Sequence, residues 1–317
     1  MKIHLLTSVV AFGVSLLLCV ILIPVLRKLK AGQNILVYVK EHAKKSGTPT
    51  MGGIAFVLAA LLASAIFLRF SDTTSTFTLL IGLAYMAVGL IDDFLKRRHK
   101  ENLGLKAYQK FIFQLAIAVF AGIYCVRAGL TVLHVPFLHK SFDIGLWVLP
   151  LSVLTFVATV NSVNLTDGLD GLASGASVAF FISMGVVIWL QGYAPSLSVI
   201  CFAIVGALLA YLIFNVSPAS VFMGDTGSLA LGGFAACVGV FSGNVLYIAV
   251  VGIMFVVSAA SVILQVIYFK LTRGKRIFLM SPIHHHFQEK GYSESKISYV
   301  YFVVTLVIGT ICVLCIL

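Results

Sequence analysis

The sequence predicts an all-α integral membrane protein, with one domain over residues 1–317 built as a bundle of about ten transmembrane helices. Of the 317 residues, 60% are hydrophobic and only 10% are charged, whereas a soluble domain carries about 25% charged residues. Most of the surface must therefore face lipid. Apolar stretches close to the roughly 20 residues that a helix needs to cross a bilayer recur along the whole chain. The predicted spans are 4–26, 51–70, 75–92, 110–127, 144–162, 172–191, 195–214, 227–243, 245–269 and 297–316.

The first and ninth spans need the most justification. Residues 4–26 are too long for the hydrophobic region of a signal peptide, and no small-residue cleavage site follows them, so they are predicted to span the membrane. Only Ser242, Gly243 and Asn244 separate the eighth span from the ninth, which predicts a very short turn there. The ninth span, 245–269, is predicted to be one continuous helix.

Positive charge orients the predicted bundle. Eighteen of the 22 Lys and Arg residues lie between spans 1 and 2, 3 and 4, and 9 and 10. Because positive loops stay on the cytoplasmic side, the odd-numbered loops are predicted to be cytoplasmic and both termini outside. Trp147 and Trp189 then fall at the outer interface, as expected for membrane tryptophans. The formal charge of +11 therefore indicates contact with anionic membrane lipids in the inner membrane and no nucleic-acid partner.

Carboxylates gather on the same predicted face. Nine of the 11 Asp and Glu residues lie in the odd-numbered loops. Two of these loops contain Asp167, Asp170 and Asp225 but no Lys or Arg, so they need a cation from a metal ion or from the basic loops.

Asp92 and Asp93 end the third span and are followed by Lys96. Adjacent carboxylates repel each other unless a cation holds both ionised. The pair is predicted to be either a magnesium ligand with a general base or a hydrated helix terminus; for an acidic pair considered alone, the terminus is preferred.

The stretch NSVNLTDGLDG, residues 161–171, follows the fifth span. It places Asn161, Asn164, Asp167 and Asp170 three residues apart, a spacing that stacks side chains on one helix face. Amides and carboxylates at a membrane mouth suit a polar ligand or a metal. The alternative is a capped turn broken by glycines.

The stretch NVSPASVFMGDTGS, residues 215–228, precedes the eighth span. Asp225 is expected in a solvated loop that exposes backbone N–H groups as an anion site. Asp225 could hold a magnesium ion that binds a phosphate. Phe222 could stack on a base, but a core position is preferred for a lone aromatic residue.

Two further stretches are polar. SPIHHHFQEKG, residues 281–291, contains three consecutive histidines, of which at most two can face one ligand. Imidazole could donate to a phosphate or transfer a proton; the alternative is an exposed loop. KKSGTPTMGG, residues 44–53, offers Lys45 and Thr50, with glycines that permit close helix packing.

Together these motifs resemble the bacterial phospho-N-acetylmuramoyl-pentapeptide transferases, within the polyprenyl-phosphate N-acetylhexosamine-1-phosphate transferases. The segments that carry the resemblance are GTPTMGG at 47–53, IDD with its following lysine at 91–96, NSVNLTDGLDG at 161–171, FMGDTGSL at 222–229 and PIHHHF at 282–287. The resemblance implies transfer of the phosphosugar peptide from UDP-MurNAc-pentapeptide to undecaprenyl phosphate, which yields UMP and lipid I. It also implies ten spans, a Mg²⁺ requirement and a homodimer. Residues 34–41, NILVYVKE, depart from the acidic Gly-Pro-containing stretch of many members.

The resemblance also assigns roles by position. Asp92 and Asp93 look like the acidic pair near the metal, and Asp225 looks like its principal ligand. We expect Asp93 and Asp225 to organise Mg²⁺, Asp92 to orient and deprotonate the lipid phosphate, and His284 to take part in catalysis. The residues that look like nucleoside, diphosphate or sugar contacts are Lys45, Thr50, Lys110, Asn164, Asp167, Asn215, Phe222, His284 and His285.

Two rival functions are disfavoured by the sequence. A transporter places ionisable residues near the bilayer midplane, and the central turns of the predicted spans contain none, which argues against transport. A transferase for UDP-N-acetylglucosamine is disfavoured by the histidine triplet and Phe287, through resemblance. The motifs are compatible with one displacement and with a covalent two-step route.

Overall fold

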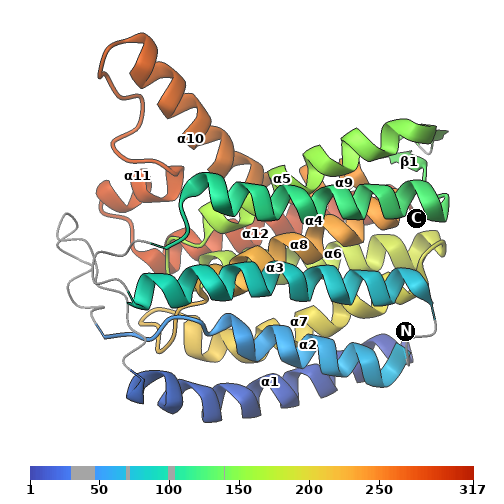
Figure 1. The fold of residues 1–317 in the computed structure, drawn as a ribbon, viewed down its shortest axis with the longest axis horizontal. Coiled ribbons are helices and arrows are strands. Elements are labelled where there is room, and N and C mark those ends of the chain that lie inside the picture. The colour runs from blue at the N-terminus through green and yellow to red at the C-terminus, as the bar shows by residue number, and fades with distance from the viewer. Residues whose placement is uncertain (30–46, 69–71, 99–103, 139) are drawn as a thin grey trace.

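The computed structural model describes residues 1–29, 47–68, 72–98, 104–138 and 140–317 as a helical bundle. Figure 1 shows most helices running along the long axis, with both termini at one end and α11 at the other. The helices are α1 (Lys2–Lys28), α2 (Gly53–Leu68), α3 (Thr73–Arg98), α4 (Ala107–Ala128), α5 (Val148–Thr166), α6 (Leu172–Gln191), α7 (Pro195–Asn215), α8 (Gly224–Phe241), α9 (Val245–Val251), α10 (Ile253–Leu271), α11 (Ile283–Glu289) and α12 (Glu294–Leu314).

Within the described residues, nine helices are long and apolar enough to cross a membrane. The second predicted span, residues 51–70, corresponds to α2, which at 16 residues is a shorter apolar helix and is not among these nine. An all-α membrane fold is thus confirmed. The sequence did not predict a short hairpin between α4 and α5, in which β1 (Val132–Val135) pairs antiparallel with β2 (Lys140–Asp143). A 3-10 turn, η2 (Gly145–Trp147), follows it.

Helix α8 lies at the centre of the bundle. Of its 18-residue apolar window, 89% is buried, compared with 28% for α1 and 22% for α10. Glycines permit this packing, because a Cβ on Gly232 would lie 2.5 Å from Cα of Val160, and one on Gly233 would lie 2.5 Å from the Tyr85 ring. Small residues let membrane helices approach closely. The α8 N-terminus is thereby held against α3 and α5, which carry the other candidate site residues.

The prediction of one continuous ninth span was wrong. The chain breaks at Gly252 into α9 and α10, although the three-residue turn before α9 is confirmed. A Cβ on Gly252 would lie 2.6 Å from the Ile248 carbonyl oxygen, so the break requires glycine. Beyond it, α10 leans away from the other helices (Figure 1).

Two helix boundaries also differ from prediction. Helix α5 continues to Thr166, so Asn161 and Asn164 lie within it. Helix α8 begins at Gly224, three residues before the predicted span, so Asp225 is in its first turn. Lys45 and the atypical segment 34–41 lie outside the described residues.

Candidate active site

Three carboxylates from two helices meet at the end of the bundle opposite the termini. Asp92 and Asp93 come from α3 and Asp225 from α8, and one oxygen of each lies within 4.8 Å of the others. We call these three residues the carboxylate cluster. They converge because α3 and α8 pack together so closely that a Cβ on Gly89 would collide with the Asp225 backbone.

Asp93 faces the N-terminus of α8. Its Oδ1 accepts the Asp225 N–H at 3.2 Å, and its Oδ2 accepts the Thr226 N–H at 2.9 Å and the Thr226 hydroxyl at 2.7 Å. A carboxylate is favourable there because the first N–H groups of a helix lack intrahelical partners. The expected anion site is therefore real, but an internal anion, Asp93, occupies these two amides.

Asp225 is surrounded by donors. Its Oδ2 accepts Lys96 Nζ at 2.9 Å and also Lys110 Nζ, while its Oδ1 accepts Asn164 Nδ2 at 2.9 Å. Its side chain is only 14% exposed. The expectation of a solvated loop was therefore wrong, because α8 begins early enough to carry Asp225 into contact with α3, α4 and α5.

Asp92 is buried beside the same two lysines. Its Oδ2 lies 2.7 Å from Lys96 Nζ and 3.8 Å from Lys110 Nζ, and its Oδ1 accepts the Leu105 N–H at 2.7 Å. A Cβ on Gly104 would lie 2.5 Å from that Oδ1, so the approach of this loop depends on glycine. Asp92 is thus no hydrated helix terminus.

The cluster suits a hard divalent cation. Carboxylate oxygens are the ligands that Mg²⁺ prefers, and a cation bound among three carboxylates would favour their ionised form. Asp225 and Asp92 each present an oxygen toward the lysines, whereas both Asp93 oxygens accept hydrogen bonds from α8. A bound cation would compete with Lys96 and Lys110 for Asp225 Oδ2.

The four polar residues Asn161, Asn164, Asp167 and Asp170 do not all share one face. Asn161 Nδ2 donates to Gln114, Asn164 Nδ2 donates to Asp225 and to Ser228, and Asp170 Oδ2 accepts the Ala219 N–H. The prediction fails at Asp170 because the helix ends at Thr166 and the chain turns.

Asp167 caps the end of α5 and is half-buried. Burial, together with the charges of Asp225, Asp93 and Asp170, raises the pKa of Asp167 to about 8. Its carboxyl is therefore mostly protonated at pH 7 and can donate a hydrogen bond.

Three other predicted contacts lie around the segment before α8. Asn215 is buried, its Oδ1 accepting the Ser174 hydroxyl and its Nδ2 donating to the Val221 carbonyl, so it holds this segment in place. Thr50 is buried and its hydroxyl has no hydrogen-bond partner among the described residues. Phe222 is half-buried and lies outside the core, so the preferred core position was wrong.

Backbone bonds join this segment to GTPTMGG. The Phe222 N–H donates to the Pro49 carbonyl at 2.8 Å, and the Gly52 N–H donates back to the Phe222 carbonyl at 2.9 Å. Two stretches far apart in the chain thus form one rim beside the carboxylate cluster.

The histidine turn, His284–His286 of α11, lies against Gly168. A Cβ on Gly168 would collide with Nε2 of His284 and lie 2.9 Å from Nε2 of His285. His286 turns away, its Nδ1 accepting the Leu279 N–H at 3.1 Å. At most two of the three can face one ligand, as predicted.

His284 is fully buried, and neither of its ring nitrogens has a hydrogen-bond partner in the part of the chain that the structure describes. Burial, assisted by His285, lowers the pKa of His284 to about 3. Its imidazole is therefore neutral at pH 7 and supplies a hydrogen-bond donor or acceptor without charge. The alternative of an exposed loop was wrong for this residue.

Two residues that contact the site had no role assigned from the sequence, although Lys96 stands out there as the basic residue that follows Asp92 and Asp93. Lys96 bonds to both Asp92 and Asp225, and its spacing of four from Asp92 on a helix is the signal that could have found it. Ser228 receives the second hydrogen bond of Asn164. No local pattern marks Ser228, since the contact depends on how α5 packs on α8.

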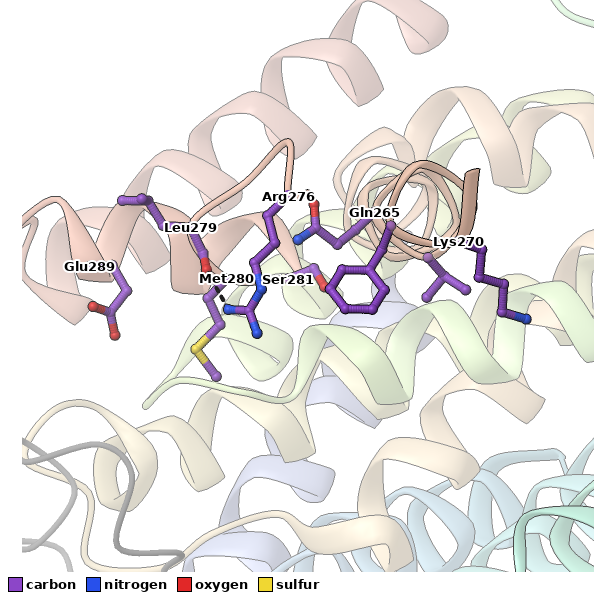
Figure 2. Close-up of a pocket in the computed structure, with 9 residues that line it drawn as sticks. Gln265, Lys270, Arg276, Leu279, Met280, Ser281 and Glu289 are labelled. Atoms are coloured by element: carbon purple, nitrogen blue, oxygen red, sulfur yellow. Dashed lines mark hydrogen bonds between the residues drawn. The ribbon is translucent and has the colours of Figure 1, made fainter. Parts of the chain in front are cut away.

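A pocket of about 640 Å³ is lined by the end of α10, by residues of the segment that follows it and by Glu289 of α11. Figure 2 shows Arg276 between Gln265 and Met280, with Glu289 and Lys270 on opposite sides. Gln265 accepts the N–H groups of Ile277 and Phe278. The pocket contains no cluster residue, but it shares α11 with the histidine turn.

The chain is similar to known proteins over nearly its whole length. The model of glycosyl transferase family 4 matches residues 75–243, which include the whole carboxylate cluster, and the phospho-N-acetylmuramoyl-pentapeptide-transferase signature 1 matches residues 45–57. The chain is 45% identical over 312 residues to the phospho-N-acetylmuramoyl-pentapeptide-transferase of Clostridium novyi (strain NT), covering 97% of this chain and 95% of that protein. It is 44% identical over 315 residues to the protein of the same name in Listeria monocytogenes serotype 4b (strain F2365), covering 98% and 97%. The corresponding protein of Clostridium perfringens (strain 13 / Type A) is 44% identical over 300 residues, 94% of each chain.

Proposed function

Because the chain belongs to the phospho-N-acetylmuramoyl-pentapeptide-transferase family, we propose that it transfers phospho-N-acetylmuramoyl-pentapeptide from UDP to undecaprenyl phosphate. The products are UMP and lipid I, an intermediate of peptidoglycan synthesis. The observation that carries the proposal at the site is the lysine-paired carboxylate cluster at one end of a membrane bundle. A water-soluble nucleotide sugar and a lipid phosphate can meet only at such a membrane surface.

The site must bring two anions together. A lipid phosphate attacks a diphosphate, so the reaction needs cationic groups around the phosphoryl oxygens. Lys96 and Lys110 supply two of them. Mg²⁺, held by Asp225 with oxygens of Asp92 or Asp93, would supply further positive charge there.

The remaining residues bind and orient. Asp92, fixed through Oδ1 by the Leu105 N–H, directs its other oxygen toward the lysines and would position the lipid phosphate. Asp167, protonated at neutral pH, and neutral His284 would donate hydrogen bonds to the nucleotide sugar without adding charge. Thr50 and Phe222 lie on the rim that GTPTMGG forms with the segment before α8.

The proposal includes the membrane side on which the site lies and the oligomeric state of the protein. The carboxylate cluster is formed near the end of α3 and in the first turn of α8, and α3 ends at the side of the bundle away from both termini (Figure 1). The excess of Lys and Arg at the same end supports a cytoplasmic site in the inner membrane. A homodimer stays a prediction, to be checked by the mass of the purified protein in detergent.

The direct test incubates the purified chain with UDP-MurNAc-pentapeptide, undecaprenyl phosphate and Mg²⁺ and measures UMP and lipid I. Replacing the donor by UDP-N-acetylglucosamine tests the rival transferase. Turnover of that donor alone would overturn the proposed substrate but leave the reaction class intact.

A further inference from the structure

A second layer of polar contacts lies one helical turn below the carboxylate cluster. Gln114 on α4 is 1% exposed, and its Oε1 accepts Asn161 Nδ2 of α5 at 2.7 Å. The Gln114 backbone carbonyl also accepts the Tyr85 hydroxyl of α3 at 3.1 Å. One residue of α4 therefore ties the three helices together.

These are the helices that supply the donors around Asp225. Gln114 follows Lys110 by four residues on α4, and Asn161 precedes Asn164 by three on α5, so each pair shares a helix face. Lys110 and Asn164 bond to different oxygens of Asp225. The Gln114–Asn161 bond thus fixes the spacing of α4 and α5. That spacing sets the separation between Lys110 and Asn164.

The backbone bond of Gln114 to Tyr85 fixes α4 relative to α3, where apolar packing is incomplete. A gap of about 390 Å³ opens between them, lined by Leu80, Ile81, Ala84, Ala116, Ile117 and Phe120. Directly beside Ala84 and Ala116, the polar contacts of Tyr85 and Gln114 cross from helix to helix. Where apolar contact is incomplete, a hydrogen bond between helices fixes their spacing.

We propose that Gln114 is a positioning residue for phosphoryl transfer. Through its side-chain bond to Asn161, it fixes α4 relative to α5, so that Lys110 and Asn164 hold Asp225 from two sides. It does not touch the substrates. The inference rests on the proposed role of the carboxylate cluster, and nothing in the sequence motifs points to Gln114.

The test compares kinetic constants of Gln114→Leu and Asn161→Leu with those of the unaltered protein. Gln114→Leu keeps the backbone bond to Tyr85 and removes only the side-chain bond. Each variant should lose about 10- to 100-fold in kcat, because small misplacement of catalytic groups costs that much, while both substrate KM values stay within about twofold. The double variant should be no slower than the slower single variant, since both remove the same bond.

A matched control is available at the opposite end of the bundle. Gln191 and Asn244 form a reciprocal amide pair at 3.0 and 2.7 Å. Gln191→Leu should lower the melting temperature in detergent about as much as Gln114→Leu does, but leave kcat within about twofold of the unaltered protein.

The proposal is overturned if kcat of Gln114→Leu stays within twofold, if the losses of the two single variants multiply in the double variant, or if Gln191→Leu loses as much kcat. If Gln114→Leu does not fold, Asn161→Leu alone decides by the same kcat and KM criteria. Failure of the proposed function is distinguishable, because the unaltered protein would then release no UMP.

Discussion

The carboxylate cluster and the histidine turn lie at the same end of the bundle, but their buried ionisable groups are accommodated in opposite ways. Asp225 is paired with Lys96 and Lys110, whereas the His284 ring has no hydrogen-bond partner among the described residues and stays neutral. Isolated buried charges are costly, so a group without a counterion is neutral. The carboxylate cluster therefore supplies the charged groups of the site, and the histidine turn contributes neutral polar contacts.

The largest expected effect comes from Asp225→Asn. Removing the charge leaves Lys96 and Lys110 without their shared oxygen and deletes a metal ligand, so turnover should fall at least about 1000-fold. UMP release is measured over a magnesium titration, with a melting curve as the control for folding. A folded variant with normal turnover at ordinary magnesium concentrations would contradict the assignment of Asp225 as a metal ligand.

The next effect concerns the cation on α4. Lys110→Met should lower kcat/KM about 100-fold, because one positive charge at the phosphoryl oxygens is lost. Lys106→Met is the matched control, since Lys106 is an exposed lysine at the N-cap of α4, four residues before Lys110, and it should change kcat/KM less than about twofold. Equal losses in both variants would point to general surface charge instead.

Asp92→Asn should reveal how the lipid phosphate is activated. A phosphate monoester has a second pKa near 6, so if Asp92 deprotonates the residual monoanion, part of the lost rate should return as pH rises from 6 to 8. The Asp225→Asn loss should not return. A flat profile for Asp92→Asn contradicts the base role, and a trapped phosphosugar–enzyme adduct from the UDP donor alone would establish the two-step route.

His284→Gln should have the smallest effect on turnover, about tenfold, with no change in the shape of the pH profile between pH 6 and 8. Its effect on stability has a definite sign. The folded-state pKa of about 3 lies below the ordinary value of 6.5, so the unfolded chain binds more protons below pH 6.5 and stability falls as pH falls.

At pH 5 this linkage amounts to about 2 kcal/mol. The melting temperature of the unaltered protein should therefore drop between pH 7 and pH 5, and that of His284→Gln should drop less. Identical pH dependence of melting in the two proteins would show that His284 is not buried in its neutral form.

Much of this architecture follows from the sequence alone. Apolar stretches long enough to cross a bilayer can satisfy their backbone only as helices, so the all-α membrane fold and most spans followed directly. Polar motifs at the ends of those spans predicted that Asp92, Asp225 and the histidines lie near one membrane face. The sequence also limited the histidine triplet to two residues facing one ligand, because consecutive residues on a helix point in different directions.

Only the tertiary structure decided how these residues are partnered. Asp93 bonds to the α8 amides, Asp225 lies between Lys96 and Lys110, and Asp170 turns away, because helix packing and two shifted helix boundaries set these contacts. The break at Gly252 likewise depends on a single missing Cβ within an apolar stretch. Periodicity and charge act along one helix, whereas the partner of a side chain is chosen by the helix that packs against it.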